Sequence, residues 1–115
     1  MEKNVKIRIL CQVYGKLLTK KQFEIITDYY DNDLSLSEIA ENNQITRQAV
    51  RDIIKKSEKK LFELEEELSF VEKNANQEKI INNILKEIIK LEQHEKKQEN
   101  KKIFEKVIKE LETLI

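Results

Sequence analysis

The chain has 115 residues, with one glycine and no proline, and 38% of its residues are charged. This scarcity of turn-forming residues excludes a fold built from strands and hairpins and favours a chain that is almost all helix. The 22 basic and 22 acidic residues give a formal net charge of zero, which argues against nucleic-acid binding unless the charges are unevenly placed.

A single cysteine, Cys11, excludes an intrachain disulfide and fits a reducing compartment. The first 18 residues contain no apolar run long enough for a signal peptide or a membrane span, because Lys6, Arg8 and Lys16 interrupt them. We therefore expect a cytoplasmic protein with no membrane partner. The apolar fraction of 39% is modest for one small core, which favours burial against a partner or a second copy.

The first two predicted helices precede a loop at residues 31–35. The first should span residues 4–18, with one buried face made of Ile7, Leu10, Tyr14, Leu17 and Leu18. Thr19 and Gln22 then form a capping-box pattern at the start of a second helix. That helix should turn Phe23, Ile26 and Tyr30 inward.

A pair of shorter elements follows, with a corner between them. Ser35 and Glu38 repeat the capping-box spacing and begin a short helix that carries Ile39 and Ala40. The segment ENNQ, residues 41–44, forms the corner, and Thr46 caps the next helix.

This next helix should be long, because its apolar stripe continues at spacings of four and three. The stripe consists of Val50, Ile54, Ser57, Leu61, Leu64, Leu68 and Val71. We favour an intrachain core covered by the two C-terminal helices, and a dimer seam is the alternative. The segment NANQ, residues 74–77, is the expected break.

Two amphipathic helices should complete the chain. Their apolar faces comprise Ile81, Ile84, Leu85, Ile88 and Leu91 in the first, and Ile103, Phe104, Val107, Ile108, Leu111 and Ile115 in the second. We thus expect a helix-turn-helix domain with a long stem helix over residues 1–73, and C-terminal helices over residues 74–115 that pack on the stem or on a partner.

The corner has the residue types that a helix-turn-helix requires. Ala40 supplies a small residue where the helices cross, and apolar contacts come from Ile39, Ile45, Ala49, Val50 and Ile53. Arginine matches guanine, glutamine matches adenine, and lysine neutralises phosphate. The candidate nucleic-acid-binding residues are Thr46, Arg47, Gln48, Arg51, Lys55, Lys56 and Lys59. The competing interpretation is a helical hairpin whose charged outer face is only solvated.

The charges are unevenly placed along the long helix. Six basic and two acidic residues give residues 47–60 a local charge of +4, and an acidic run, Glu63 to Glu67, follows. Because salt screens charges beyond ~8 Å, a local basic patch can attract phosphate despite a neutral total. The acidic run is either a solvated face or a mimic of phosphate for a basic partner.

No pattern indicates an enzyme or a cofactor. Cys11 should be a small core residue, and His94 lacks companions for a metal site and should be exposed. Gly-rich phosphate loops and nucleophile motifs are absent from the sequence.

Residues 5–68 resemble the YlxM family of small bacterial helix-turn-helix proteins. The matching positions are Tyr14, Gly15, Leu17, Leu18 and Thr19, then Ser35, Leu36, Glu38, Ile39 and Ala40, then Thr46, Arg47, Gln48, Ala49 and Val50. Asn43 departs from the pattern, which has a bulky apolar residue there. The resemblance implies an all-α fold without a wing, similar to the promoter-reading domain of sigma factors.

The same resemblance implies a role in the signal recognition particle pathway, because the family is encoded beside the particle's GTPase. Two functions follow as expectations. One is a regulatory protein that binds DNA or structured RNA. The other is a protein-interaction module whose C-terminal helices bind the GTPase. A homodimer is compatible with both.

Overall fold

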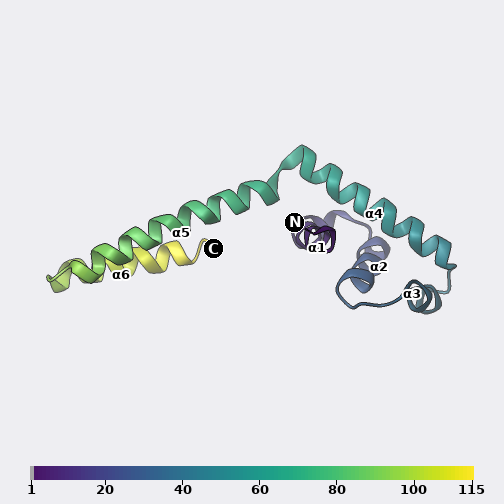
Figure 1. Cartoon of the computed structure of the whole chain (residues 1–115), viewed down its shortest axis with the longest axis horizontal. Coiled ribbons are helices and arrows are strands. Elements are labelled where there is room, and N and C mark those ends of the chain that lie inside the picture. The colour runs from purple at the N-terminus through teal and green to yellow at the C-terminus, as the bar shows by residue number, and fades with distance from the viewer. Residues whose placement is uncertain (1) are drawn as a thin grey trace. The chain divides into compact units, whose positions relative to one another are not determined.

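The computed structural model describes residues 2–115, and within them every regular element is helical. The elements are α1 (Lys3–Tyr14), a 3-10 turn η1 (Gly15–Leu17), α2 (Lys20–Tyr30), α3 (Leu36–Asn43), α4 (Arg47–Leu68), α5 (Phe70–His94) and α6 (Gln98–Glu112) (Figure 1). This confirms the predicted all-α fold. The chain forms two compact units, and the boundary between them in the sequence lies between Val71 and Glu72. No helix among residues 2–115 combines the length and the apolar character that crossing a membrane requires.

Three helices begin at the caps that the sequence predicts. Thr19 accepts a hydrogen bond from the Gln22 N–H (3.1 Å), and the Gln22 side chain accepts one from the Thr19 N–H (3.0 Å). Ser35 and Glu38 form the same reciprocal pair, at 3.1 and 3.2 Å. Thr46 accepts from the N–H three residues ahead. Each such cap stabilises its helix by about 0.5–2 kcal/mol, so these residues fix where α2, α3 and α4 begin.

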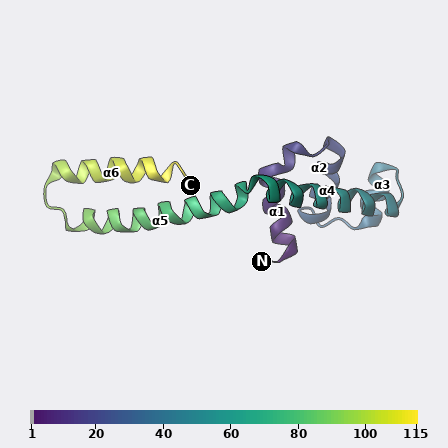
Figure 2. The same ribbon diagram turned by 90° about the horizontal axis from the view of Figure 1, so that it is seen from above.

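The apolar stripe of α4 is the centre of the N-terminal unit. Its residues Val50, Ile54, Ser57 and Leu61 are buried, and Leu64 and Leu68 are half-buried against the same core, as is Val71 at the start of α5. α1, α2 and α3 cover this stripe, as Figures 1 and 2 show. The expectation of an intrachain core is confirmed for the N-terminal unit, where α1, α2 and α3 form it with α4. That the C-terminal helices pack on the stem stays a prediction.

Two residues expected in the core lie at the surface. α1 ends at Tyr14, and the tighter 3-10 turn that follows shifts Leu17 out of the helical register, so it is 57% exposed. Phe23 is 41% exposed and lies against Gly15, where an added Cβ would be 2.5 Å from the ring. In α2, Ile25 occupies the core beside Ile26 in place of Phe23.

The break after α4 lies at Ser69, whose φ of 55° and ψ of 29° are left-handed. α5 runs unbroken through residues 74–77, so the predicted break there is wrong. The Tyr14 hydroxyl explains the break, because it donates to the Glu65 carboxylate and accepts from the Phe70 N–H (3.1 Å). The same carboxylate accepts from the Val71 N–H (3.0 Å). These bonds satisfy N–H groups at the start of α5, which lack partners within the helix.

The C-terminal unit is a pair of antiparallel helices (Figure 2). Of the predicted apolar faces, Ile81 and Leu85 are buried, and a half-buried group consists of Ile88, Phe104, Val107, Ile108 and Leu111. Ile84, Leu91, Ile103 and Ile115 are exposed. Glu95 begins the short connection between α5 and α6. Its carboxylate accepts hydrogen bonds from the N–H groups of Lys96 and Lys97, both at 2.9 Å. The bond from Lys97, with smaller contributions from other groups, lowers the pKa of Glu95.

Removing the Tyr14 hydroxyl tests the junction between α4 and α5. Burial first, and then the bond to Glu65, raises the pKa of this phenol, so it remains a donor at neutral pH. We expect Tyr14→Phe to lower the free energy of unfolding by about 1–3 kcal/mol, because it removes two part-buried hydrogen bonds, one of them to a carboxylate. Denaturant titration measures the change. Tyr29→Phe, at a more exposed position, is the control and should change stability by at most ~0.5 kcal/mol. Equal stability of the two variants would contradict this account.

The reactivity of Cys11 tests the packing of α1. The thiol is half-buried against the core, as expected, and burial followed by the charge of Asp31 raises its pKa from 9.0 to about 11. Because only the thiolate reacts, we expect alkylation at pH 8 to be about a hundredfold slower in the native protein than in denaturant. The native rate should rise with pH until about pH 11. Equal native and denatured rates would show that the thiol is not held in this environment.

Candidate nucleic-acid interface

The corner between α3 and α4 is built around Gln44. This residue is left-handed, with φ 56° and ψ 42°, and the following Ile45 N–H donates to the Ala40 carbonyl at 3.0 Å. Such bonds close the last turn of α3. Asparagine tolerates this conformation better than most residues, yet glutamine rather than either asparagine of the corner takes the left-handed position. Asn43 instead donates to the Ile39 carbonyl (2.8 Å) and accepts from Lys21 (2.9 Å), so its departure from the family pattern is accommodated by hydrogen bonds.

Apolar packing at the corner fixes the direction of α4. Ile39 and Val50 are completely buried, and Ala40 is 6% exposed where the helices cross. Ile45 and Ile53 pack against the same core. This is the arrangement predicted for a helix-turn-helix, with the second helix braced by the first.

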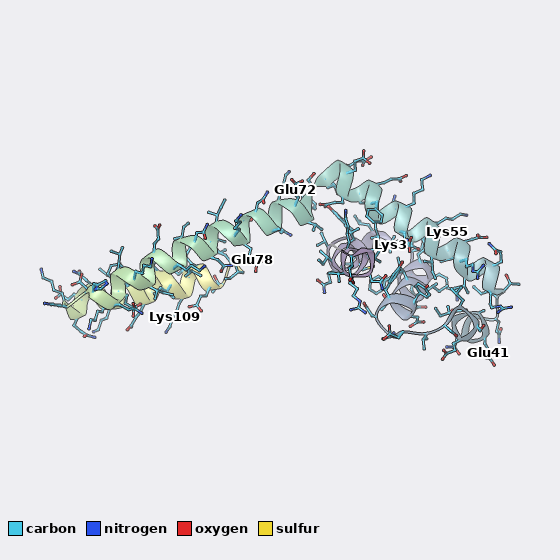
Figure 3. The ribbon with its side chains drawn as sticks, in the orientation of Figure 1. Lys3, Glu41, Lys55, Glu72, Glu78 and Lys109 are labelled. Carbon is cyan, nitrogen blue, oxygen red and sulfur yellow. The ribbon has the colours of Figure 1, made fainter. Side chains whose placement is uncertain are left out.

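All seven candidate binding residues are exposed between the cap of α4 and Lys59: Thr46, Arg47, Gln48, Arg51, Lys55, Lys56 and Lys59. Charged side chains also project from the other helices of each unit (Figure 3). Some candidates have partners within the chain. Gln48 donates to Asp52 at 3.0 Å, and Lys59 lies 4.0 Å from Glu63. Whether the seven residues bind nucleic acid stays a prediction.

The candidate binding residues lie on different parts of the α4 surface. Thr46, Arg47, Gln48 and Arg51 line a concavity of about 400 Å³ at the start of α4. Arg51 and Lys55 line a second concavity of about 450 Å³ one turn further on. At about 100° per residue, Lys56 lies ~140° around the helix from Arg51 and belongs to another face.

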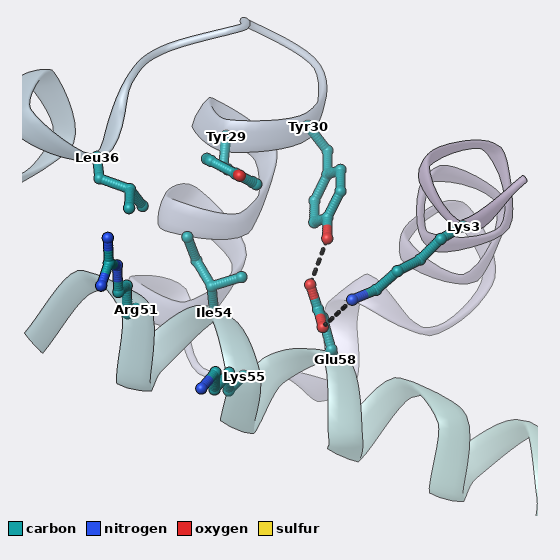
Figure 4. A pocket seen from close by; sticks show the side chains of 8 residues that line it. All are labelled: Lys3, Tyr29, Tyr30, Leu36, Arg51, Ile54, Lys55 and Glu58. Carbon is teal, nitrogen blue, oxygen red and sulfur yellow. Dashed lines mark hydrogen bonds and ion pairs between the residues drawn. The ribbon is translucent and has the colours of Figure 1, made fainter. Parts of the chain in front are cut away.

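The second concavity contains residues that the sequence did not single out, above all Lys3, Tyr29, Tyr30 and Glu58 (Figure 4). The Tyr30 hydroxyl donates to one oxygen of Glu58, and Lys3 lies 3.2 Å from the other. Burial, followed by the bond to Glu58, raises the pKa of Tyr30. No local pattern could identify this group, because Lys3, Tyr29 and Glu58 come from three different helices.

The acidic run after the basic segment is not uniform. Glu65 is half-buried in the junction with Tyr14, whereas Glu63, Glu66 and Glu67 are exposed. His94 is exposed, as predicted. Over residues 2–115, no cluster of three or more histidine, cysteine, aspartate or glutamate side chains is placed to hold a metal ion.

Comparison with known proteins shows which family this chain is similar to. A family model described as "Putative helix-turn-helix protein, YlxM / p13 like" matches residues 1–112. A UPF0122 protein of Acetivibrio thermocellus is 39% identical over all of this chain and 98% of its own length. A UPF0122 protein of Clostridium acetobutylicum is 37% identical over 96% of both chains. A third, from Clostridium botulinum, is 46% identical over 76% of this chain and 81% of its own length. The chain therefore belongs to the UPF0122 family of YlxM/p13-like helix-turn-helix proteins.

Proposed function

We propose that this protein is a nucleic-acid-binding regulator whose contact surface is the exposed face of α4 from its cap to Lys59. The observation that carries the proposal is an exposed basic surface on a helix that is capped, braced and buried along its opposite face. A helix held in this way presents its first turns to a major groove without rearrangement. Membership of a helix-turn-helix family, rather than an enzyme family, supports the same function.

Each group of side chains has a distinct role in this proposal. Arg47, Gln48 and Arg51 contact base edges, and Lys55, Lys56 and Lys59 neutralise phosphates. Thr46 sets the start of the helix through its cap. With a local charge of only +4 over residues 47–60, one copy neutralises few phosphates, so its affinity is modest and falls with salt. DNA and structured RNA are the two candidate ligands.

The setting that we propose is the bacterial cytoplasm and the signal recognition particle pathway. The single cysteine supports a reducing compartment. The link to the particle rests on the resemblance to YlxM proteins, which are encoded beside its GTPase. Binding to that GTPase would be compatible with a nucleic-acid surface on α4, because each uses different residues.

A second candidate function, a protein-interaction module, is favoured by the apolar surface of the C-terminal unit. Ile80, Ile84 and Leu91 recur at spacings of four and seven, so they share one face of α5, and each is more than 40% exposed. Ile103 on α6 and Leu114, which lies just after the end of α6, are similarly exposed. Such a surface on a small helical pair is typical of a site that binds a partner, either the GTPase or a second copy.

Substitutions on α4 test the nucleic-acid surface. Preferred duplex DNA and RNA hairpin ligands are first selected from random pools with the unaltered protein. We expect Arg51→Ala to cost about 1–3 kcal/mol of discrimination between preferred and scrambled ligands, because it removes a base contact. Lys55→Ala should weaken all ligands alike and reduce the salt slope by about one. Anisotropy titrations at two salt concentrations separate these effects.

Lys90→Ala on α5 is the matched control, since it removes an equal charge from an exposed helical position outside α4. All three variants should keep their stability within ~0.5 kcal/mol. If Arg51→Ala and Lys55→Ala bind every ligand as the unaltered protein does, the surface is only solvated and the proposal fails.

Substitutions on α5 test the interaction module. We expect Ile80→Ser combined with Leu91→Ser to abolish self-association or binding to the purified GTPase, since both need the apolar face. Sedimentation over a range of concentrations and a binding titration with the GTPase measure the two outcomes. Val5→Ser, at an exposed apolar position on α1, is the control. A monomer at high micromolar concentration that does not bind the GTPase would contradict this candidate.

A further inference from the structure

The second concavity on α4 combines an aromatic ring, apolar side chains and positive charge. It has a volume of about 450 Å³ and lies between the start of α1, the end of α2, the start of α3 and α4 (Figure 4). Tyr29, Leu36 and Ile54 supply its apolar wall, and Arg51 and Lys55 lie along one side. A surface that only binds the outside of a duplex has no need of an aromatic wall.

The positive charge of this concavity is not cancelled within the chain. Its one acid, Glu58, already bonds to Tyr30 and pairs with Lys3. Arg51 and Lys55 form no ion pair within residues 2–115. Three cations thus accompany one carboxylate, and the two on α4 are available to an anion.

The ring of Tyr29 is held in place and partly open to solvent. It packs edge-on against Tyr30, with centroids 5.0 Å apart and planes at 86°, and Tyr30 is buried. Tyr29 itself is 37% exposed. A planar group stacking on this ring would therefore meet a pre-positioned surface, which lowers the entropic cost of binding.

We propose that the concavity binds one unpaired nucleotide, with its base on Tyr29 and its phosphate on Lys55, while Arg51 keeps its contact with a base edge. A nucleoside phosphate is the ligand that combines a flat aromatic group with an anion. Arg51 lines both this concavity and the one at the start of α4, so a strand at the first turn can continue into it. The inference rests on the proposed nucleic-acid function and deepens it, because it names an unpaired base as the preferred feature.

Binding of a base on Tyr29 should favour unpaired over paired nucleotides. Taking a base out of a paired stack costs a few kcal/mol, whereas a bulged or single-stranded base avoids most of that cost. The concavity should therefore discriminate a hairpin with one bulged nucleotide from a fully paired hairpin of the same sequence. Base–aromatic stacking of typical strength corresponds to roughly a fivefold to hundredfold preference.

The test compares bulged and fully paired hairpins, made as DNA and as RNA, by anisotropy with the full chain. We expect the bulged hairpin to bind more tightly, Tyr29→Ala to remove that preference, and Tyr29→Phe to keep it because the ring remains. Phe23→Ala removes a comparably exposed ring from the other end of α2 and should also keep the preference. The DNA and RNA series show which sugar the site accepts.

A second readout places the base directly. With 2-aminopurine at the bulge, stacking on Tyr29 should change the fluorescence on binding, and Tyr29→Ala should remove that change while Tyr29→Phe retains it. Thermal melting of each variant shows whether the fold is kept, and the response to Tyr29→Phe is decisive if Tyr29→Ala does not fold. A loss of the preference in Tyr29→Phe would overturn the stacking role.

The outcomes separate this inference from the proposed function. If paired and bulged hairpins bind equally, and Arg51→Ala still weakens both, the inference fails and the nucleic-acid function stands. If no hairpin binds, both fail. Displacement of the bulged hairpin by poly-glutamate, with no response to Tyr29→Ala, would assign the concavity to an acidic protein segment and overturn the inference.

Discussion

Burial of one face of α4 is the constraint on which the rest of the N-terminal unit depends. Val50, Ser57 and Leu61 are completely enclosed, and Ser57 satisfies its hydroxyl within the helix by donating to the Ile53 carbonyl at 2.7 Å. Because side chains project at about 100° per residue, burying this face also fixes where Arg51 and Lys55 point. One helix therefore serves as the wall of the core and as the candidate binding surface, and its orientation is set before any ligand arrives.

Local signals made much of this fold predictable. The caps at Thr19, Ser35 and Thr46 are patterns within three residues, and the structure confirms all of them. The break at Ser69 could not be predicted in the same way, since it depends on Tyr14, which is 56 residues from Phe70 in sequence. Weak helix propensity in residues 74–77 was a poorer guide than this long-range hydrogen bond, because tertiary contacts outweigh propensity differences of a few tenths of a kcal/mol per residue.

In the candidate site too, features set by nearby residues could be predicted from the sequence, and features set by long-range packing could not. The basic residues of α4 follow from sequence, because a helix-turn-helix places its outward residues at fixed positions after the cap. Their grouping does not follow. Tyr29 and Lys3 join Arg51 and Lys55 only through the packing of α1 and α2 on α4, whereas Lys56 lies on another face although it is next to Lys55 in the chain. The assignment of separate roles to residues 1–73 and 74–115 stays a prediction.

The neutral total charge conceals an internal arrangement of the acids. Two half-buried glutamates of α4 accept hydrogen bonds from tyrosine hydroxyls within the chain. Glu58 bonds to Tyr30 and also pairs with Lys3. Glu65 bonds to Tyr14 and also accepts from the Val71 N–H. Their fields are thus partly cancelled where they arise. Arg47, Arg51 and Lys55 form no such pairs within residues 2–115. At physiological salt, charges more than ~8 Å away are screened, so a phosphate near the first half of α4 would interact mainly with these three basic side chains. The local positive charge therefore matters more for phosphate binding than the neutral total.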